Sequence, residues 1–265
     1  MAAAKKLTGA ILARSASKGR RGKRTIAAFL VEPGSANDVT VKDGDTITVD
    51  GKTCRLDAID APELDQVCLN EAGPTMPCGR EARERLAQYI GARAVRCDDN
   101  GPDPVFRRRR ICVCTVEGET MSINQWLVRQ GVAIDFEPFA HGRYQSDEND
   151  ARQNRRGLWS GCFVAPQHLR YWRKPVAPLL GSACSNEPNA RDKLFPDNPE
   201  MPPGCSIKGK FAVRAKVTGY RGIYHLEGCS SYRTLKNPNR WFCSEEDAQA
   251  AGFRKALTCR GSRAG

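Results

Sequence analysis

Residues 43–63 read DGDTITVDGKTCRLDAIDAPE. Two short alternating runs, 46–49 and 54–56, flank Asp50-Gly51, and an Asp-Gly pair between two such runs is a strong signal for a β-hairpin. A third run of the same kind, 39–41, precedes the turn signal Asp43-Gly44. The stretch therefore predicts three short neighbouring strands joined by tight turns.

The same stretch gathers acidic side chains around a single arginine, Arg55. The acids are Asp43, Asp45, Asp57, Asp60 and Glu63. With the hairpin turn at Asp50-Gly51, Asp45 and the loop of Asp60 lie at the same end of neighbouring strands and can share one ion. Hard cations such as Ca²⁺ take carboxylate and carbonyl oxygens, and phosphodiester cleavage needs such an ion, a group that handles water and cations that offset charge. Acid-lined turns without a metal are the simpler alternative.

Further elements follow along the chain. Residues 79–90, GREARERLAQYI, carry apolar side chains at helical spacing, and 94–97 and 111–116 are strand-like. Ser122 is suited to cap a second helix over 122–130, and a polar third helix over 147–156 ends at Gly157. Short strands followed by helices predict a small β-barrel with helices packed on it, an α+β fold.

With these motifs in place, the 43–63 pattern resembles the metal and phosphate site of the staphylococcal nuclease (thermonuclease) family. That pattern runs DGDT, then Arg, then five residues on D-x-P-E. Further family motifs follow in the right order, at 79–82 (GREA), 124–133 (NQWLVRQGVA) and 156–159 (RGLW). The resemblance covers about residues 38–174. It implies a five-stranded OB-type barrel and Ca²⁺-dependent, endonucleolytic hydrolysis of DNA or RNA.

The resemblance also implies roles for individual residues. Asp45 and Asp60 are expected as carboxylate ligands of Ca²⁺, with the backbone carbonyl of Ala61, where the family usually has Thr, as a further ligand. Glu63 is expected to orient or activate the attacking water. Asp43 is expected to lie next to these ligands without binding the ion itself.

Arg55 and a later arginine are expected to clamp the phosphate. The family motif for the later arginine is D-x-Y-G-R, but residues 105–111 here read VFRRRRI. Counting back from Gly118 identifies Arg109, with Arg108 and Arg110 as neighbours that could stand in for it. The missing Tyr-Gly turn leaves two alternatives: a solvated arginine loop, and a catalytically impaired OB-fold protein that only binds nucleic acid. The joint presence of Asp45, Asp60, Glu63 and Arg55 favours the enzyme.

The chain has 12 cysteines and no CxxC pair. That pattern favours disulfides in an oxidising compartment over a zinc ribbon, and hence export to the periplasm or outside the cell rather than a cytoplasmic location. Cys68 and Cys78 flank one loop, and Cys97 and Cys114 sit on two runs that should pair, so we expect disulfides among them. The full connectivity stays open.

We expect four parts: a basic leader or tail over 1–36, the nuclease-like domain over 37–174, a Pro-rich linker over 175–204, and a small module over 205–260. The module resembles those behind bacterial nuclease domains and, distantly, the zinc-binding domain that begins the Ada alkylation-repair protein. Zn²⁺ there would be held by His225, Cys229, Cys243 and Cys259, although Ala256 replaces one ligand. The alternative is two disulfides among Cys205, Cys229, Cys243 and Cys259.

The formal net charge is +12, but eight cations precede the first acid, Glu32, which leaves 34 cations against 30 acids in the rest of the chain. A third interpretation therefore makes the leader the main nucleic-acid binder. The leader is equally compatible with a poor signal peptide, a transit peptide and a disordered tail.

No apolar run approaches the roughly 18 residues of a membrane span. We expect a monomer with DNA or RNA as substrate.

Overall fold

The computed structural model describes residues 27–28 and 37–259, and all structural statements below concern these residues. The expected leader over 1–36 lies outside them except for β1 (Ala27–Ala28), which pairs with β8.

A six-stranded mixed sheet forms the first domain, in the order β1-β8-β9-β4-β3-β2. Its remaining strands are β2 (Val39–Val41), β3 (Thr46–Val49), β4 (Lys52–Leu56), β8 (Val95–Pro102) and β9 (Arg110–Val116). Only β4 and β9 run parallel. Val49 pairs with Lys52, and Asp50 and Gly51 both have positive φ, so the hairpin turn predicted at Asp50-Gly51 is confirmed.

The fold class is α+β, as predicted, but among the described residues no strand pairing closes the sheet into a barrel. The side chain of Asn37, just before the edge strand β2, instead hydrogen-bonds to the start of β8, the second strand from the opposite edge. Its Nδ2 donates to the carbonyl of Val95 at 2.7 Å, and its Oδ1 accepts from the N–H of Val95 at 2.9 Å.

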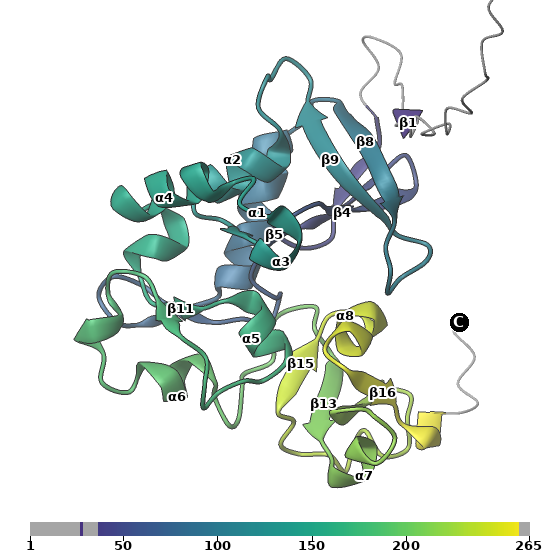
Figure 1. Ribbon diagram of the computed structural model, residues 1–265. Coiled ribbons are helices and arrows are strands. Elements are labelled where there is room, and N and C mark those ends of the chain that lie inside the picture. The colour runs from purple at the N-terminus through teal and green to yellow at the C-terminus, as the bar shows by residue number, and fades with distance from the viewer. Residues whose placement is uncertain (1–26, 29–36, 260–265) are drawn as a thin grey trace, which may run out of the picture.

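The three predicted helices are present as α1 (Cys78–Ile90), α2 (Ile123–Arg129) and α4 (Gln145–Gln153) (Figure 1). The Ser122 hydroxyl accepts the N–H of Gln125 and caps α2 as predicted. Helix α1 buries Leu86 and Ile90 in the core beneath the sheet, at the helical spacing seen in the sequence. No helix in the described part of the chain is long and apolar enough to cross a membrane.

Shorter elements complete this domain. They are β5 (Ile59–Asp60), β6 (Cys68–Leu69), β7 (Thr75–Met76), β10 (Ile134–Asp135), α3 (Glu137–Ala140), η1 (Gly157–Ser160), β11 (Phe163–Val164) and α5 (Pro166–Arg170). Strand β5 pairs with β10, which fixes the backbone at Asp60.

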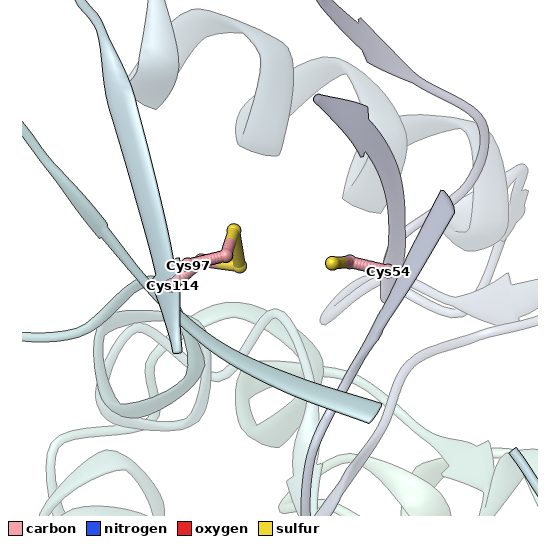
Figure 2. A group of neighbouring side chains, drawn as sticks. All are labelled: Cys54, Cys97 and Cys114. Atoms are coloured by element: carbon pink, nitrogen blue, oxygen red, sulfur yellow. A yellow bond between two sulfur atoms is a disulfide. The ribbon is translucent and has the colours of Figure 1, made fainter. Parts of the chain in front are cut away.

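All twelve cysteines are paired in six disulfides. The pairs are Cys54–Cys112, Cys68–Cys78, Cys97–Cys114, Cys162–Cys184, Cys205–Cys243 and Cys229–Cys259. Figure 2 shows the Cys97–Cys114 disulfide facing Cys54. The sulfur atoms of these three residues lie within 4.8 Å of one another. Because these sulfurs are bonded in disulfides, they are not the thiolates that a metal binds, and we assign them to the core.

Removing the Cys54–Cys112 disulfide by a double Cys→Ala substitution is expected to lower the free energy of unfolding by about 2 to 5 kcal/mol. The bond links residues 58 apart in the sequence and is fully buried. Urea unfolding followed by Trp fluorescence measures the loss. The matched control removes Cys229–Cys259 and should leave the unfolding transition of the first domain in place. An unchanged transition midpoint for the Cys54 and Cys112 variant would contradict the prediction.

The expected linker over 175–204 is not a free linker for most of its length. β12 (Leu179–Leu180) pairs with β11, and Cys184 bonds to Cys162. The short η2 (Cys184–Asn186) and α6 (Ala190–Leu194) follow, and Leu194 and Phe195 are fully buried. Apolar residues between the prolines pack on the first domain, so the boundary moves to about residue 195, and only 196–204 connect the two units.

The C-terminal unit, residues 205–259, has a four-stranded sheet in the order β15-β13-β14-β16. Its elements are β13 (Ile207–Phe211), α7 (Val213–Lys216), β14 (Gly222–His225), β15 (Arg240–Phe242), α8 (Glu245–Ala250), β16 (Phe253–Lys255) and η3 (Leu257–Cys259). Ser244 caps α8 by accepting the N–H of Asp247 at 3.0 Å, as its sequence pattern predicts.

The cysteines of this unit follow the disulfide alternative rather than the zinc alternative. Cys243 is bonded to Cys205 and Cys229 to Cys259, while His225 Nδ1 lies 2.8 Å from the hydroxyl of Ser231. The expected zinc set of His225, Cys229, Cys243 and Cys259 is therefore not assembled, because disulfide sulfurs cannot serve as thiolate ligands.

Candidate active site

Arg55 joins the two carboxylates that the sequence singled out. Its Nη1 donates to Asp45 Oδ1 at 2.7 Å, and its Nη2 donates to Asp60 Oδ1 at 3.3 Å. The register explains this, because Arg55 on β4 lies opposite Thr46, the neighbour of Asp45, and the chain reaches Asp60 one turn later. Burial opposes the charge on Arg55, but the Asp45 and Asp60 carboxylates raise its pKa.

Both carboxylates are buried and held by backbone groups. The N–H of Ala61 donates to Asp45 Oδ2 at 3.2 Å, and the N–H of Gln167 donates to Asp60 Oδ2 at 3.0 Å. Gly44 allows this close packing, since a Cβ at that position would lie 2.7 Å from the Cβ of Ala61. The oxygens are thus oriented before any ligand arrives, which is what a preorganised site requires.

Glu63 lies beside this pair and contacts a residue that the sequence did not single out, Arg170. Nε of Arg170 donates to Glu63 Oε1 at 2.7 Å, and Nη2 of Arg170 reaches Asp60 Oδ1 at 2.6 Å. Burial raises the pKa of Glu63 to about 7, although the Arg170 and Arg240 guanidiniums oppose the shift. A carboxyl with a pKa near neutrality is suited to accept a proton.

Asp43 lies next to these groups. Its Oδ1 accepts the N–H of Asp45 at 2.9 Å. Burial, together with the neighbouring charges of Asp45 and Asp247, raises the pKa of Asp43 well above its usual range. Excess negative charge of this kind disfavours the ionised form unless a cation compensates it.

The arginine loop brings one of its members to the site. Arg109 lies against the same pocket as Asp45 and Arg55, whereas Arg107 and Arg108 are exposed. Asp103 holds Arg109 through Nε at 2.8 Å and Nη2 at 2.7 Å. The Arg109 guanidinium also lies over the Phe106 ring, 4.6 Å from its centroid. In this loop, which lacks the Tyr-Gly turn, Asp103 and Phe106 hold the Arg109 side chain.

These groups border one small pocket, here called the carboxylate pocket, with a volume of about 40 Å³. The first domain contributes Asp43, Asp45, Arg55, Ala61, Pro62, Glu63, Leu64, Asp65, Arg109 and Arg170. The fully buried Asp60 lies behind the pocket and accepts hydrogen bonds from Arg55 and Arg170. Buried carboxylate oxygens from Asp45 and Asp60, with Asp43 adjacent, form the hard donor set that suits Ca²⁺.

A larger cleft of about 430 Å³ adjoins the carboxylate pocket and shares Arg55, Arg109 and Arg170 with it. We call it the aromatic cleft, because its lining includes Phe106, Phe136, Phe139 and Tyr171. Sequence reasoning missed this cleft, as it missed Arg170 and Asp103. The Asp103-Pro104 pair is a turn signal that could have identified the loop, but the sequence has no local signal for Arg170.

Replacing Asp103 by Asn is expected to cost about 1 to 3 kcal/mol of folding free energy at neutral pH, because it weakens charged hydrogen bonds. Burial alone would raise the pKa of Asp103, but the N–H groups of Phe106 and Val105 and the Arg109 guanidinium lower it. Its stabilisation is therefore present above the ordinary aspartate pKa of 3.8 and is lost as the pH falls through the lower folded-state pKa. Urea unfolding of wild type and variant across this pH range measures the difference.

The matched control is Asp99→Asn, which breaks a comparable pair, Arg110–Asp99 at 2.7 Å. Asp103→Asn should slow any reaction that needs Arg109, and Asp99→Asn should not. Equal effects of the two variants on such a reaction would show that Arg109 is not specifically required.

Comparison with known proteins places this site in context. A family model described as "Staphylococcal nuclease homologue" matches residues 53–161. The succinoglycan biosynthesis protein ExoI of Rhizobium meliloti (strain 1021) is 33% identical over 165 residues, covering 58% of this chain and 83% of that protein. Uncharacterized endonucleases of Escherichia coli and of Escherichia coli O157:H7 are 32% and 31% identical over 145 residues, covering 51% of this chain and 82% of each relative.

Proposed function

This chain belongs to the staphylococcal nuclease family and is a nuclease, and from that premise we propose that it is a Ca²⁺-dependent endonuclease hydrolysing phosphodiester bonds of DNA and of RNA. The observation that carries the proposal is the convergence of Asp45 and Asp60 on Arg55, with Glu63 beside them in one pocket. The names of the two Escherichia coli relatives support the same reaction.

In this proposal the carboxylates of Asp45 and Asp60 and the carbonyl of Ala61 hold Ca²⁺, and Asp43 adds negative charge next to them. When bound, the ion offsets charge on the phosphate and on the attacking oxygen. The N–H groups of Ala61 and Gln167 already orient the two carboxylates by hydrogen-bonding to them.

Glu63 accepts a proton from the attacking water. Its burial and its raised pKa favour this role near neutral pH. Arg170 positions the Glu63 carboxylate by donating to Oε1 and leaves Oε2 available for the water.

Arg55 and Arg109 bind the phosphate oxygens. A guanidinium has five N–H donors, and the Arg55 and Arg109 donors committed to Asp45, Asp60 and Asp103 leave others that can face the pocket. The aromatic cleft next to both arginines offers Phe106 and Phe136 to an adjoining base, and base–aromatic stacking tolerates any sequence.

The family also supports an OB-type interpretation of the sheet, with Asn37 taking the place of strand pairing at the open edge. Six disulfides are suggestive of an oxidising environment and support export from the cytoplasm. We further propose that the protein acts as a monomer.

Cleavage of plasmid and single-stranded DNA and RNA, with Ca²⁺ and with EGTA, tests the proposal. Cleavage that requires Ca²⁺ is expected. Binding without cleavage would instead support the alternative, a catalytically impaired OB-fold nucleic-acid-binding protein. Deleting residues 1–36 tests the basic leader as the main binder, and we expect nucleic-acid binding to persist without it.

A further inference from the structure

The C-terminal unit forms one wall of the carboxylate pocket. Trp241, Phe242 and Cys243 contribute from the end of β15, and Glu246, Asp247 and Ala250 contribute from α8. Figure 1 shows this unit beside α5, with α8 on its side nearest the first domain. Nothing in the proposed chemistry requires such a wall.

A buried ion pair holds the unit in place. Nε and Nη2 of Arg240 each donate to the Asp65 carboxylate at 2.5 Å, and Nη1 donates to the carbonyl of Leu169 at 3.2 Å. The Arg240 side chain is 2% exposed and that of Asp65 7%. Removing one partner of such a pair leaves an uncompensated buried charge, so Arg240 is the natural point at which to weaken the docking.

Smaller contacts surround this pair. Arg221 donates to the carbonyl of Tyr171 at 2.8 Å and lies over the Tyr171 ring, 4.9 Å from its centroid. The rings of Trp172 and Phe211 meet at 5.3 Å. The docking surface is therefore formed by Asp65 and residues 169–172, the segment that also carries Arg170.

The docking is not covalent. All twelve cysteines lie in the described part of the chain; four disulfides fall within 54–184 and two within 205–259, so none joins the two units. Only the segment 196–204 connects them. The C-terminal unit can therefore leave the first domain without reduction of a disulfide.

With the C-terminal unit docked, the carboxylate pocket itself is narrow, whereas the adjoining aromatic cleft is wide enough for a ligand. The carboxylate pocket has about 40 Å³, room for roughly three water molecules at 10–15 Å³ each. The aromatic cleft has about 430 Å³, within the range of about 300 to 1,000 Å³ that is typical of ligand sites. The carboxylates of Glu246 and Asp247 stand on the α8 side and repel a polyanion there.

We propose that the docked C-terminal unit makes this nuclease selective for single-stranded over duplex nucleic acid. The inference rests on the proposed nuclease function and names the substrate class of the same site. A single strand can turn one base into the aromatic cleft and bring its phosphate to Arg55 and Arg109, which border both cavities. A duplex is a rigid rod whose bases are stacked, and α8 and its acids keep it from the carboxylate pocket.

The test compares one labelled oligonucleotide, alone and annealed to its complement, as substrates of the full-length wild type and Arg240→Gln. The ratio of single-strand to duplex cleavage is expected to fall about tenfold or more in the variant, because undocking exposes the carboxylates to the duplex. Arg254→Gln is the matched control, since the Arg254 guanidinium donates to the carbonyl of Lys255 and lies outside the docking surface; its ratio should not change.

Amide hydrogen exchange shows whether Arg240→Gln undocks the unit while both cores stay folded. A second route inserts a protease site between Glu200 and Met201, cuts the folded chain, and dilutes it until size-exclusion chromatography shows that the unit has separated, with no substitution in either unit's packing. An unchanged cleavage ratio after undocking by either route would overturn the proposal. An equal rise in the cleavage of both substrates would also overturn it, since that result describes general inhibition.

Binding of the same two oligonucleotides in EGTA, measured by fluorescence anisotropy, separates this proposal from the nuclease function. If no form cleaves, the proposed function fails, and the binding ratio still decides the inference. If undocking lowers the ratio of single-strand to duplex affinity by tightening duplex binding, the result supports the proposed role of the C-terminal unit. An unchanged ratio of the two affinities would refute it.

Discussion

Glu63→Gln is expected to reduce the rate of cleavage by about a hundredfold to ten-thousandfold, the usual contribution of a positioned proton acceptor. The amide keeps the size of the side chain but cannot take a proton from water. Because Glu63 is not among the proposed Ca²⁺ ligands, Ca²⁺ affinity should change little. Initial rates at saturating Ca²⁺ and a calorimetric Ca²⁺ titration measure the two quantities.

Glu84→Gln is the matched control, because it makes the same chemical change on the outer face of α1, where Glu84 pairs only loosely with Arg80 at 3.9 Å. It should leave the rate unchanged. A Glu63→Gln enzyme that keeps the wild-type rate would show that another group handles the water.

Asp60→Asn is expected to abolish cleavage, to weaken Ca²⁺ binding by about a hundredfold, as losses at a metal site do, and to destabilise the fold by about 1 to 3 kcal/mol, because it weakens buried charged hydrogen bonds. Asp60 is fully buried and accepts from Arg55, Arg170 and the N–H of Gln167. Its neutralisation removes one of the two carboxylate partners of each guanidinium, since Arg55 keeps Asp45 and Arg170 keeps Glu63. Urea unfolding and a Ca²⁺ titration of the folded variant measure these effects.

Asp57→Asn is the comparison for this variant. Asp57 belongs to the same acidic stretch but pairs with the half-exposed Arg143 at 2.9 Å, so its loss should cost about 1 kcal/mol or less. Ca²⁺ affinity in Asp57→Asn should match the wild type. If the two variants lost Ca²⁺ affinity equally, Asp60 would not be a ligand.

Short-range patterns predicted much of this protein correctly. Asp50-Gly51 located a hairpin, Ser122 and Ser244 located helix starts, and the spacing of Asp45, Arg55 and Asp60 placed them at one end of neighbouring strands. In each case the deciding interaction spans ten residues or fewer, so backbone conformation and strand alternation are enough to carry the information.

The prolines of 175–204 led to a wrong linker prediction, because proline content reports only local backbone preference. Proline breaks regular elements and so suggests an extended connection, but it does not prevent the residues between from packing. Leu194 and Phe195 are buried against the first domain, and Cys184 is bonded to Cys162. The proline content of 175–204 describes only this segment, whereas the burial of its apolar side chains depends on the distant residues that pack against them.

The acidic hairpin, its helices and the family membership follow from the amino-acid sequence, because their determinants are local or ordered along the chain. The surroundings of the site depend on tertiary structure. Arg170 reaches Glu63 from 107 residues away, and Arg240 reaches Asp65 from 175 residues away. A single arginine has no pattern that names its partner, and a buried ion pair forms only when two distant segments pack together and exclude water from both charges.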